Sequence, residues 1–227
     1  MYEHAGSARP QGITRALVIA TLSATLCLVA GCGGGDAPGP VVMNEDEQER
    51  WEISLVEMRI EKNETFMDST TTSLPLEDLA TFEGLNYYYP EPSLRFHVPV
   101  KVVAKPDTVV LEKRKGQRIP YLRKGTVSFR AAGKKHSLFV FGPANPEQGD
   151  YLWLPFYDGT NGEETYPGGR YLDLELTPDN TVELDFNYAY NPLCDYNPTK
   201  YNCTLPPPEN TLPFPVRAGE KRYHLTE

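Results

Sequence analysis

The chain has 227 residues, 40% of them hydrophobic, and a formal net charge of −9 at pH 7. This length is sufficient for one domain with a sizeable core. The excess of acidic residues argues against nucleic acid and against anionic lipid headgroups as partners, because both carry negative charge.

The N-terminal 31 residues have the three parts of a secretory signal peptide. Arg9 and Arg15 precede a short apolar segment, residues 16–30, and small residues close it before Cys32. Fifteen apolar residues are fewer than the roughly 20 that a membrane-spanning helix needs, which weighs against an uncleaved transmembrane anchor. Small residues ending on a cysteine are typical of bacterial lipoproteins. We therefore expect cleavage before Cys32 and acylation of that residue, with palmitate among the acyl chains.

This interpretation divides the chain into a signal peptide (1–31), a flexible tether (32–43) and one β-rich domain with an N-terminal helix (44–227). The tether is rich in glycine and proline and cannot pack a core. Gly33 and Gly34 give no inner-membrane retention signal such as an aspartate after the cysteine. We expect an exported protein, lipid-anchored to the cell envelope, and in the outer membrane if the host has two membranes.

Two cysteines belong to the predicted domain, because Cys27 lies in the signal peptide and Cys32 is the acylation site. Cys194 and Cys203 remain, and in an oxidising compartment a disulfide between them is expected. Closing this short loop would stabilise the fold by roughly 2–3 kcal/mol. The alternatives are free thiols or a metal site. Zinc needs four ligands, and the four histidines are scattered, so we expect no metal and no cofactor.

The first predicted element of the domain is a helix over residues 44–63. Asn44 can cap it, Glu47 follows three residues later, and acidic residues fill the first turn. The helix is expected to dock the side that carries Trp51 on the rest of the domain. A second, shorter helical segment is predicted over residues 75–82.

Strand patterns dominate from Leu94 onward. Residues 94–102 alternate apolar and polar, although Pro99 within them indicates an edge strand or a bulge. Further short strands are predicted over residues 108–112, 118–123, 126–132 and 136–141. Regularly spaced short strands predict a mainly β fold, here a single-domain antiparallel sandwich or partly open barrel with an N-terminal helix.

One hairpin is predicted from its apolar faces. A two-residue type II′ turn at Gly133-Lys134 sets Phe129 opposite Leu138 and Val127 opposite Val140.

A second hairpin is predicted between residues 170–176 and 181–187. Both segments have one apolar face, and a three-residue loop at 178–180 sets Leu174 opposite Leu184. A loop of two or four residues would instead set leucines against carboxylates, because side chains alternate with a period of two.

This second register crowds four carboxylates on the other face of the hairpin. Asp173 falls opposite Asp185 and Glu175 opposite Glu183, with β-carbons about 4.5–5.5 Å apart. Water and salt, a cation, an arginine or a retained proton must then offset the repulsion. Arg170 lies on the leucine face, where its guanidinium needs a carboxylate or carbonyl partner.

The block from Pro155 to Lys221 holds much of the tyrosine and several long motifs. These motifs resemble the bacterial and archaeal family called domain of unknown function 1684, with a looser likeness back to about Gln48. The matching residues are Asp158, Thr160, Gly162, Glu164, Thr165, Tyr166, Gly169 to Leu172, Asp185 to Asn187, Ala189 to Pro192, Cys194, Cys203, Pro206, Pro207, Glu209, Asn210 and Arg217 to Lys221. Tyr188, Asp195 and Thr204 depart from the pattern. The resemblance implies no activity, because the family has none assigned.

One class of function that stays open is a hydrolase-type enzyme that uses paired carboxylates as acid and base. The candidate catalytic residues are Asp158, Glu164, Asp173 and Asp185, with Arg170 and Arg217 for an anionic group and Tyr166 or Tyr190 as donors. The chain has no Gly-x-Ser-x-Gly elbow, phosphate loop or His-rich zinc motif. We therefore favour a non-catalytic role.

The other class is a binding or structural module of the envelope. Tyrosines beside Asn and Asp suit a glycan or a peptide, because rings stack and polar groups bond hydroxyls. The candidate binding residues are Tyr166, Tyr190, Asn191, Tyr196 and Asn210. The same tyrosines could instead form an aromatic core. The loop 158–164 could hold a cation, although an ordinary Asp-Gly turn explains it as well.

Three outcomes separate these hypotheses. An enzyme would have a pocket lined by at least two of the candidate carboxylates and an arginine. A binding module would have an open groove with exposed rings of Tyr157, Tyr188 or Tyr196, and a scaffold would have neither. Asn210, Arg217 and Glu220 are expected to tie the Pro-rich C-terminal segment to the sheet.

Overall fold

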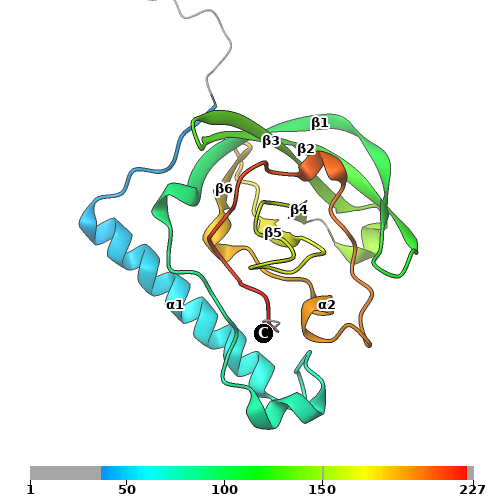
Figure 1. Cartoon of the computed structure of the whole chain (residues 1–227). Helices are drawn as coiled ribbons and strands as arrows, with labels where there is room; N and C mark the ends of the chain where they lie inside the picture. The colour runs from blue at the N-terminus through cyan, green and yellow to red at the C-terminus, as the bar shows by residue number, and fades with distance from the viewer. Residues whose placement is uncertain (1–36, 150, 224–227) are drawn as a thin grey trace, which may run out of the picture. The chain divides into compact units, whose positions relative to one another are not determined.

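The computed structural model describes residues 37–149 and 151–223 (Figure 1). The described residues belong to one compact unit. The predicted signal peptide and Cys32 lie outside the described residues, so both stay predictions. Among the residues that are described, no helix is long and apolar enough to cross a membrane.

Six antiparallel strands form one curled, half-barrel sheet, which confirms the mainly β fold with an N-terminal helix (Figure 1). The order across the sheet is β5-β4-β3-β2-β1-β6. The strands are β1 (Arg95–Glu112), β2 (Arg118–Ala131), β3 (Lys134–Pro143), β4 (Leu152–Phe156), β5 (Arg170–Leu174) and β6 (Thr181–Asp185). The first four predicted strands therefore join in pairs into two long strands. A register irregularity between Val102 and Asp107 bends β1 without ending it.

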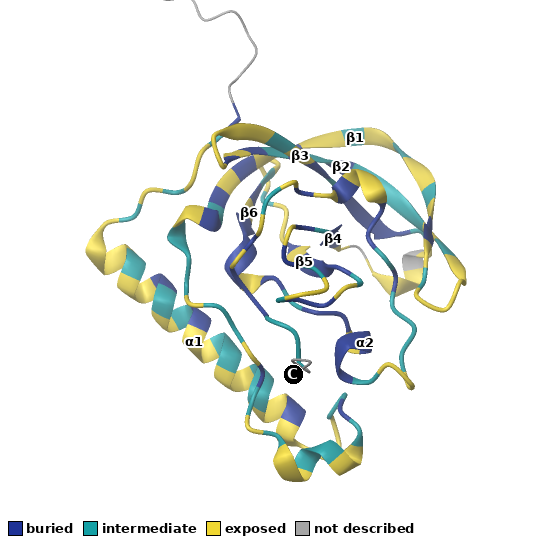
Figure 2. Cartoon of the chain, viewed as in Figure 1, coloured by how far each residue is buried: buried dark blue, intermediate teal, exposed yellow. Residues whose placement is uncertain are grey.

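The main core lies on the inner face of the curled sheet. Alternate residues of β1 and β2, among them Phe96, Val98, Val127 and Phe129, are fully buried there. Figure 2 shows this buried surface lining the inside of the arch. Each such side chain stabilises the fold by about 1.5–3 kcal/mol relative to an exposed one, so the period-two pattern of the sequence decides which face of the sheet turns inward.

A smaller aromatic cluster covers the opposite face of the sheet. It contains Leu111, Phe141, Trp153 and Tyr171. Trp153 and Phe141 are directly paired neighbours on β4 and β3. Two members of this cluster, Trp153 and Tyr171, line the candidate site described below.

The helix α1 (Glu45–Met67) begins at the predicted capping box and runs one turn further than predicted. The Asn44 side chain accepts a hydrogen bond from the backbone N of Glu47, and the Glu47 carboxylate accepts one from the backbone N of Asn44, each at 2.9 Å. Trp51 docks on the sheet as expected: its indole N–H donates to Asp185 at 2.7 Å. The other end of α1 buries Phe66 against Tyr196.

The remaining helical segments are short. The predicted helix at 75–82 is the 3-10 helix η1 (Leu76–Thr81). The others are single turns: η2 (Pro92–Leu94), η3 (Pro146–Gln148), η4 (Phe186–Tyr188), α2 (Leu193–Tyr196) and η5 (Pro208–Asn210).

The hairpin between β2 and β3 exists, but its predicted turn is wrong. The turn is Ala132-Gly133, with φ of 48° and 72°, and Val127 pairs with Leu138 rather than with Val140. Two consecutive positive φ angles define a type I′ turn, which matches the twist of the strands better than other two-residue turns. The shift is one residue on each strand, so every side chain stays on the predicted face.

The predicted hairpin between residues 170–176 and 181–187 is also wrong. β5 and β6 occupy opposite edges of the sheet: Leu174 pairs with Leu152 on β4, and Leu184 pairs with Phe96 on β1. Both leucine faces still enter the main core. The curled sheet gives each strand another partner, β4 for β5 and β1 for β6, which the local pattern could not reveal.

The predicted patch of four carboxylates is absent as a consequence. Asp173 pairs with Trp153, while Asp185 pairs with Arg95. Glu183 accepts hydrogen bonds from Arg95 Nε at 3.0 Å and Nη2 at 2.7 Å. The strand pairing thus offsets the negative charge of β6 with an arginine from β1.

Candidate functional site

Arg170, a candidate for anion binding, is fully buried at the start of β5 and has structural partners. Its Nη2 donates to Asp158 Oδ2 at 2.9 Å, and both side chains are fully buried. The guanidinium also donates to the backbone carbonyls of Val216 (2.6 Å), Ala218 (2.5 Å) and Glu220 (3.2 Å). The predicted carboxylate and carbonyl partners are therefore present, and they tie the C-terminal segment to the sheet.

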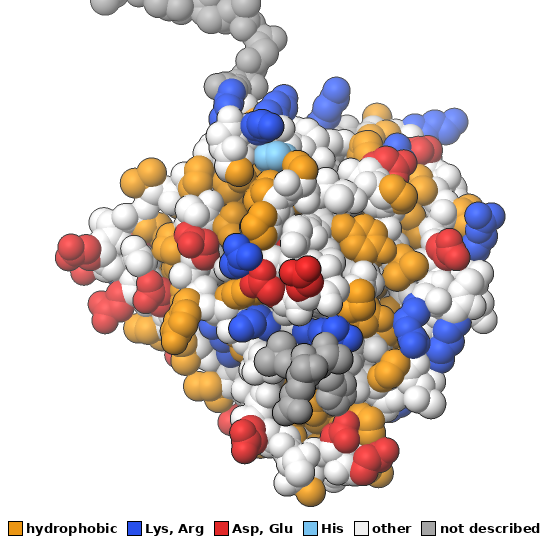
Figure 3. All heavy atoms as spheres, in the orientation of Figure 1, with side chains coloured by type: hydrophobic (Ala, Val, Ile, Leu, Met, Phe, Trp, Pro, Cys, Tyr) orange, Lys and Arg blue, Asp and Glu red, His pale blue; other side chains and the backbone are white. Residues whose placement is uncertain are grey.

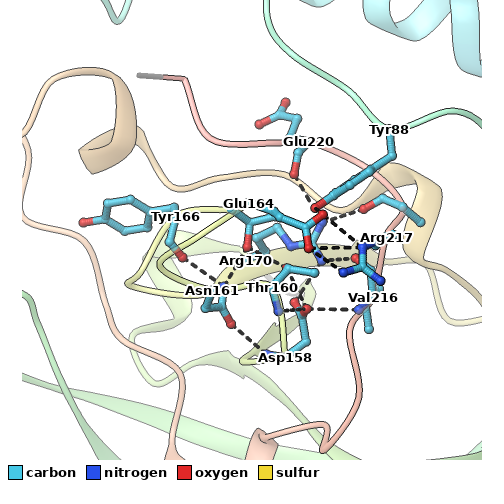
Figure 4. Close-up of polar contacts among 12 residues, drawn as sticks. Tyr88, Asp158, Thr160, Asn161, Glu164, Tyr166, Arg170, Val216, Arg217 and Glu220 are labelled. Atoms are coloured by element: carbon cyan, nitrogen blue, oxygen red, sulfur yellow. Dashed lines mark hydrogen bonds and ion pairs between the residues drawn. The ribbon is translucent and has the colours of Figure 1, made fainter. Parts of the chain in front are cut away.

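Asp158, a candidate catalytic carboxylate, has no oxygen left for a substrate or a cation (Figure 4). Its Oδ1 accepts hydrogen bonds from the backbone N and hydroxyl of Thr160 and from the backbone N of Val216, at 2.6–3.0 Å. The loop 158–164 is thus explained as an aspartate-capped turn. Within residues 37–149 and 151–223, no group of three or more His, Cys, Asp and Glu side chains is arranged to hold a metal ion.

Glu164 and Arg217 form a surface ion pair beside this turn (Figure 4). Arg217 donates to the Glu164 carboxylate through Nε and Nη2 at 2.7–3.1 Å, and the Tyr88 hydroxyl donates at 3.0 Å. The hydrogen bonds from Arg217 hold the pKa of Glu164 below its ordinary value. This pair adds another tie between the turn and the C-terminal segment.

Glu220 is a buried carboxylate that the sequence assigned only to tying down the C-terminal segment. It is 2% exposed and accepts hydrogen bonds from Lys62 of α1, from the hydroxyls of Tyr196 and Tyr87, and from the backbone N of Asn191. Burial and the charge of Glu220 raise the pKa of Tyr196 well above its ordinary value. One carboxylate thus joins α1, α2 and the C-terminal segment.

A groove of about 980 Å³ lies on the outer side of β4 and β5, and we call it the aromatic groove. Its aromatic lining is Phe66, Tyr121, Tyr151, Trp153, Tyr171, Tyr190, Tyr196 and Tyr201. Trp153 stacks on Tyr121 and meets Tyr171 edge-on, with ring centroids 4.9 and 4.8 Å apart. Neighbouring aromatic rings of this kind form a rigid apolar platform.

A few polar groups interrupt this platform. Asp173 is exposed in the groove and accepts a hydrogen bond from the Tyr190 hydroxyl at 3.0 Å. The Lys62 ammonium lies 5.2 Å from the Tyr190 ring centroid. Desolvation by the surrounding rings raises the pKa of Asp173 above its ordinary value, while the Tyr190 hydrogen bond and the charge of Lys62 oppose this rise.

The predicted disulfide joins Cys194 and Cys203 and holds one wall of the aromatic groove. Directly after it, the carbonyl of Thr204 accepts a hydrogen bond from the Tyr171 hydroxyl. The disulfide segment is therefore fastened to β5, the strand that carries Asp173.

The candidate catalytic residues do not come together. Asp158 and Arg170 are buried in one pair, Glu164 and Arg217 form another, and Asp185 is buried against Trp51 and Asn187. Of the candidate carboxylates, Asp173 is the one that lines the aromatic groove, and no arginine lines it. This groove therefore lacks the pair of candidate carboxylates and the arginine that we expected of an enzyme.

The candidate binding residues divide into three places. Tyr190, Asn191 and Tyr196 line the aromatic groove, whereas Tyr166 lines a separate pocket of about 300 Å³. Asn210 is fully buried and bonds the backbone of Phe139 and Pro155, which fastens the C-terminal segment to β3 and β4 as expected.

The rings chosen as indicators of an open groove lie elsewhere or are buried. Tyr196 is buried at the groove wall, Tyr188 is exposed beside α1, and Tyr157 does not line the groove. Tyr121 and Trp153, which form its floor, lie outside any recognisable motif. The sequence offered no signal for them beyond strand alternation.

A family model matches residues 80–221 of the chain. The chain belongs to this family, DUF1684, whose description is protein of unknown function. The resemblance found in the motifs is thereby confirmed. The DUF1684 region contains every residue of the aromatic groove except Lys62 and Phe66 of α1.

A solved structure is similar to this DUF1684 chain. It is the solution NMR structure of an uncharacterized protein from Haloarcula marismortui, 37% identical, with a TM-score of 0.60. The similarity covers 79% of this chain and 97% of that chain. A search of curated proteins gives no match.

Proposed function

We propose that this DUF1684 protein is an exported lipoprotein, anchored in the cell envelope through acylated Cys32, that binds a glycan or a peptide in the aromatic groove without catalysing a reaction. In a host with two membranes the anchor belongs to the outer membrane. The leader and Cys32 support the anchor, and the groove supports the binding role.

The observation that carries the binding role is the contrast between the aromatic groove and the charged side chains of the family motifs. The paired carboxylates and arginines of those motifs bond one another and the backbone. The groove instead is lined by the rings of Tyr121 and Tyr151 and by the largely buried ring of Trp153, beside the exposed carboxylate of Asp173. Apolar walls with a few polar groups are typical of small-molecule and carbohydrate sites.

Tryptophan fluorescence tests this function directly, because the chain has two tryptophans and one of them lies in the groove. We expect a member of a panel of envelope oligosaccharides and peptides to change the fluorescence. The Trp153→Phe variant should lose this change, and the Trp51→Phe variant should keep it, because Trp51 does not line the groove.

A matched pair of tyrosine variants then measures the affinity. Tyr151 and Tyr188 are similarly exposed, 42% and 37%, but only Tyr151 lines the groove. Truncating an anchoring ring costs more than about fivefold in affinity, so Tyr151→Ala should weaken binding and Tyr188→Ala should not. Equal weakening by both variants, or a panel without any ligand, would contradict the proposal.

One observation favours a hydrolase as the second candidate function. Asp173 combines exposure in the groove with a pKa that desolvation raises, and a raised pKa is what a general acid needs. Mass spectrometry of the bound ligand decides this: cleavage by the wild type but not by Asp173→Asn would replace the binding role with an enzymatic one.

A further inference from the structure

The charges of this domain are strongly segregated along the chain. Residues 101–135, which span most of β1, all of β2 and the β2–β3 turn, contain eleven Lys and Arg but two Asp and Glu. The helix α1 has the opposite balance, with eight Asp and Glu and three Lys and Arg. The net charge of the whole chain conceals this segregation.

Four of these lysines are exposed between the middle of β1 and the β2–β3 turn, and we call them the basic strip. Lys101 lies on β1, Lys105 follows it at the register irregularity, and Lys134 and Lys135 begin β3. In the part of the chain that the structure describes, none of the four forms an ion pair. Figure 3 shows Lys and Arg side chains gathered along the edge over β1, β2 and β3, away from the acidic groups of α1.

The N-terminal end of the described chain lies at this same edge. The backbone N of Arg130, beside the β2–β3 turn, donates to the carbonyl of Pro38 at 2.7 Å. Cys32 precedes Pro38 by six residues, and six extended residues span at most about 20 Å. An anchor at Cys32 therefore keeps Pro38, which is bonded to the end of β2 beside Lys134 and Lys135, within about 20 Å of its attachment point.

We propose that the basic strip is the membrane-facing surface of the domain and binds the headgroups of anionic phospholipids. Each lysine near an anionic surface strengthens binding about fivefold, and attraction acts within a Debye length of about 8 Å. The tether keeps the strip near the bilayer, and its lysines come within that range when the domain turns the strip toward the membrane. The acidic helix α1 is repelled, so the two charged regions together fix one orientation of the domain.

The first experiment measures orientation on vesicles. In a chain that starts at Cys32, the other two cysteines are joined, so the Cys32 thiol can be coupled to a maleimide lipid. Amine acetylation is then read by mass spectrometry on vesicles with and without phosphatidylglycerol in phosphatidylcholine. We expect the basic strip to be labelled at least about fivefold more slowly on the anionic vesicles, and exposed Lys200 to be labelled equally on both.

The second experiment measures binding without a tether, using the chain from residue 32 with Cys32→Ala. Residues 36–227 form one compact unit with its own core. We expect co-sedimentation with phosphatidylglycerol vesicles and none with phosphatidylcholine alone. Replacing the four lysines of the strip by glutamine should weaken this binding more than about a hundredfold. A control with the same charge change, Arg50, Lys115, Arg118 and Lys200 to glutamine, should bind within about twofold of the parent.

Equal labelling of the strip on the two vesicle types overturns the proposal, as does equal weakening in the two variants or the absence of binding to anionic vesicles. Both assays work whether or not the cell acylates Cys32 and whatever the groove binds. A negative result in both assays therefore does not contradict the proposed ligand binding or the anchor. If ligand binding or acylation is disproved instead, these assays still test the basic strip.

Discussion

Buried carboxylates are stabilised in this domain by different sets of donors. Asp158 has the Arg170 guanidinium, and Glu220 has Lys62 and two tyrosine hydroxyls. Asp195 is 6% exposed and accepts hydrogen bonds from the Asn191 side chain and the backbone N of Tyr223, but from no cation. Burial raises its pKa to about 6. Asp195 is also one of the residues that depart from the family motifs described above.

Asp195 gives the protein a defined pH dependence. The native state binds the proton of Asp195 more tightly than the unfolded chain, whose carboxyl titrates near its ordinary pKa of 3.8. The free energy of unfolding should therefore fall as pH rises from 4 to 6, by about 3 kcal/mol in total. Chemical denaturation across this range should show a flatter pH dependence for Asp195→Asn than for the wild type. Identical pH slopes in the two proteins would contradict the assignment.

At the scale of elements, the β2–β3 hairpin contains a local conflict between residue and conformation. Its type I′ turn needs two positive φ angles, and Gly133 accepts one of them without cost. Ala132 has a φ of 48°, where an alanine is strained by roughly 1–2 kcal/mol. The pairing of β2 with β3 over ten residue pairs imposes this turn.

Relieving the strain at Ala132 should stabilise the domain. Asparagine tolerates positive φ, and Asn-Gly is the favoured type I′ pair. We expect Ala132→Asn to raise the free energy of unfolding by about 1 kcal/mol, measured by denaturant titration. Ala132→Val, which is worse in this conformation, should lower it. A loss of stability in the asparagine variant would mean that the turn is not type I′ in solution.

At the scale of the whole molecule, the structure combines a ligand groove, a basic strip and a predicted anchor. The groove lies on the outer side of β4 and β5, whereas the strip lies on β1 and β3 at the edge where the described chain begins. Both can therefore work at once: a domain held at a bilayer by the strip keeps a separate surface for its ligand.

The anchor itself is tested by fractionation of cells. Each buried methylene of an acyl chain contributes about 0.8 kcal/mol, so three chains should hold the protein in the membrane fraction. We expect Cys32→Ala to move it to the soluble fraction or to block its processing at residue 31. Cys27→Ala changes a cysteine five residues earlier and should leave the protein membrane-bound. If both variants fractionate like the wild type, Cys32 is not the anchor.

The sequence by itself determined the features that depend on nearby residues. The capping box of Asn44 and Glu47, the inward face of β1 and the Cys194–Cys203 disulfide could all be predicted, because each follows from the local spacing of residue types. The motifs between residues 155 and 221 likewise gave the family.

The tertiary structure alone decided which strands pair and which side chains meet. The leucine faces of β5 and β6 fit each other, yet they pack with Leu152 and Phe96 at opposite edges of the sheet. The groove joins Tyr121, Trp153 and Tyr171 from three strands, so no single sequence motif could predict it. Periodicity is a property of one segment, and it fixes the face of each side chain. The partner on that face depends on contacts between distant segments, which only the folded chain contains.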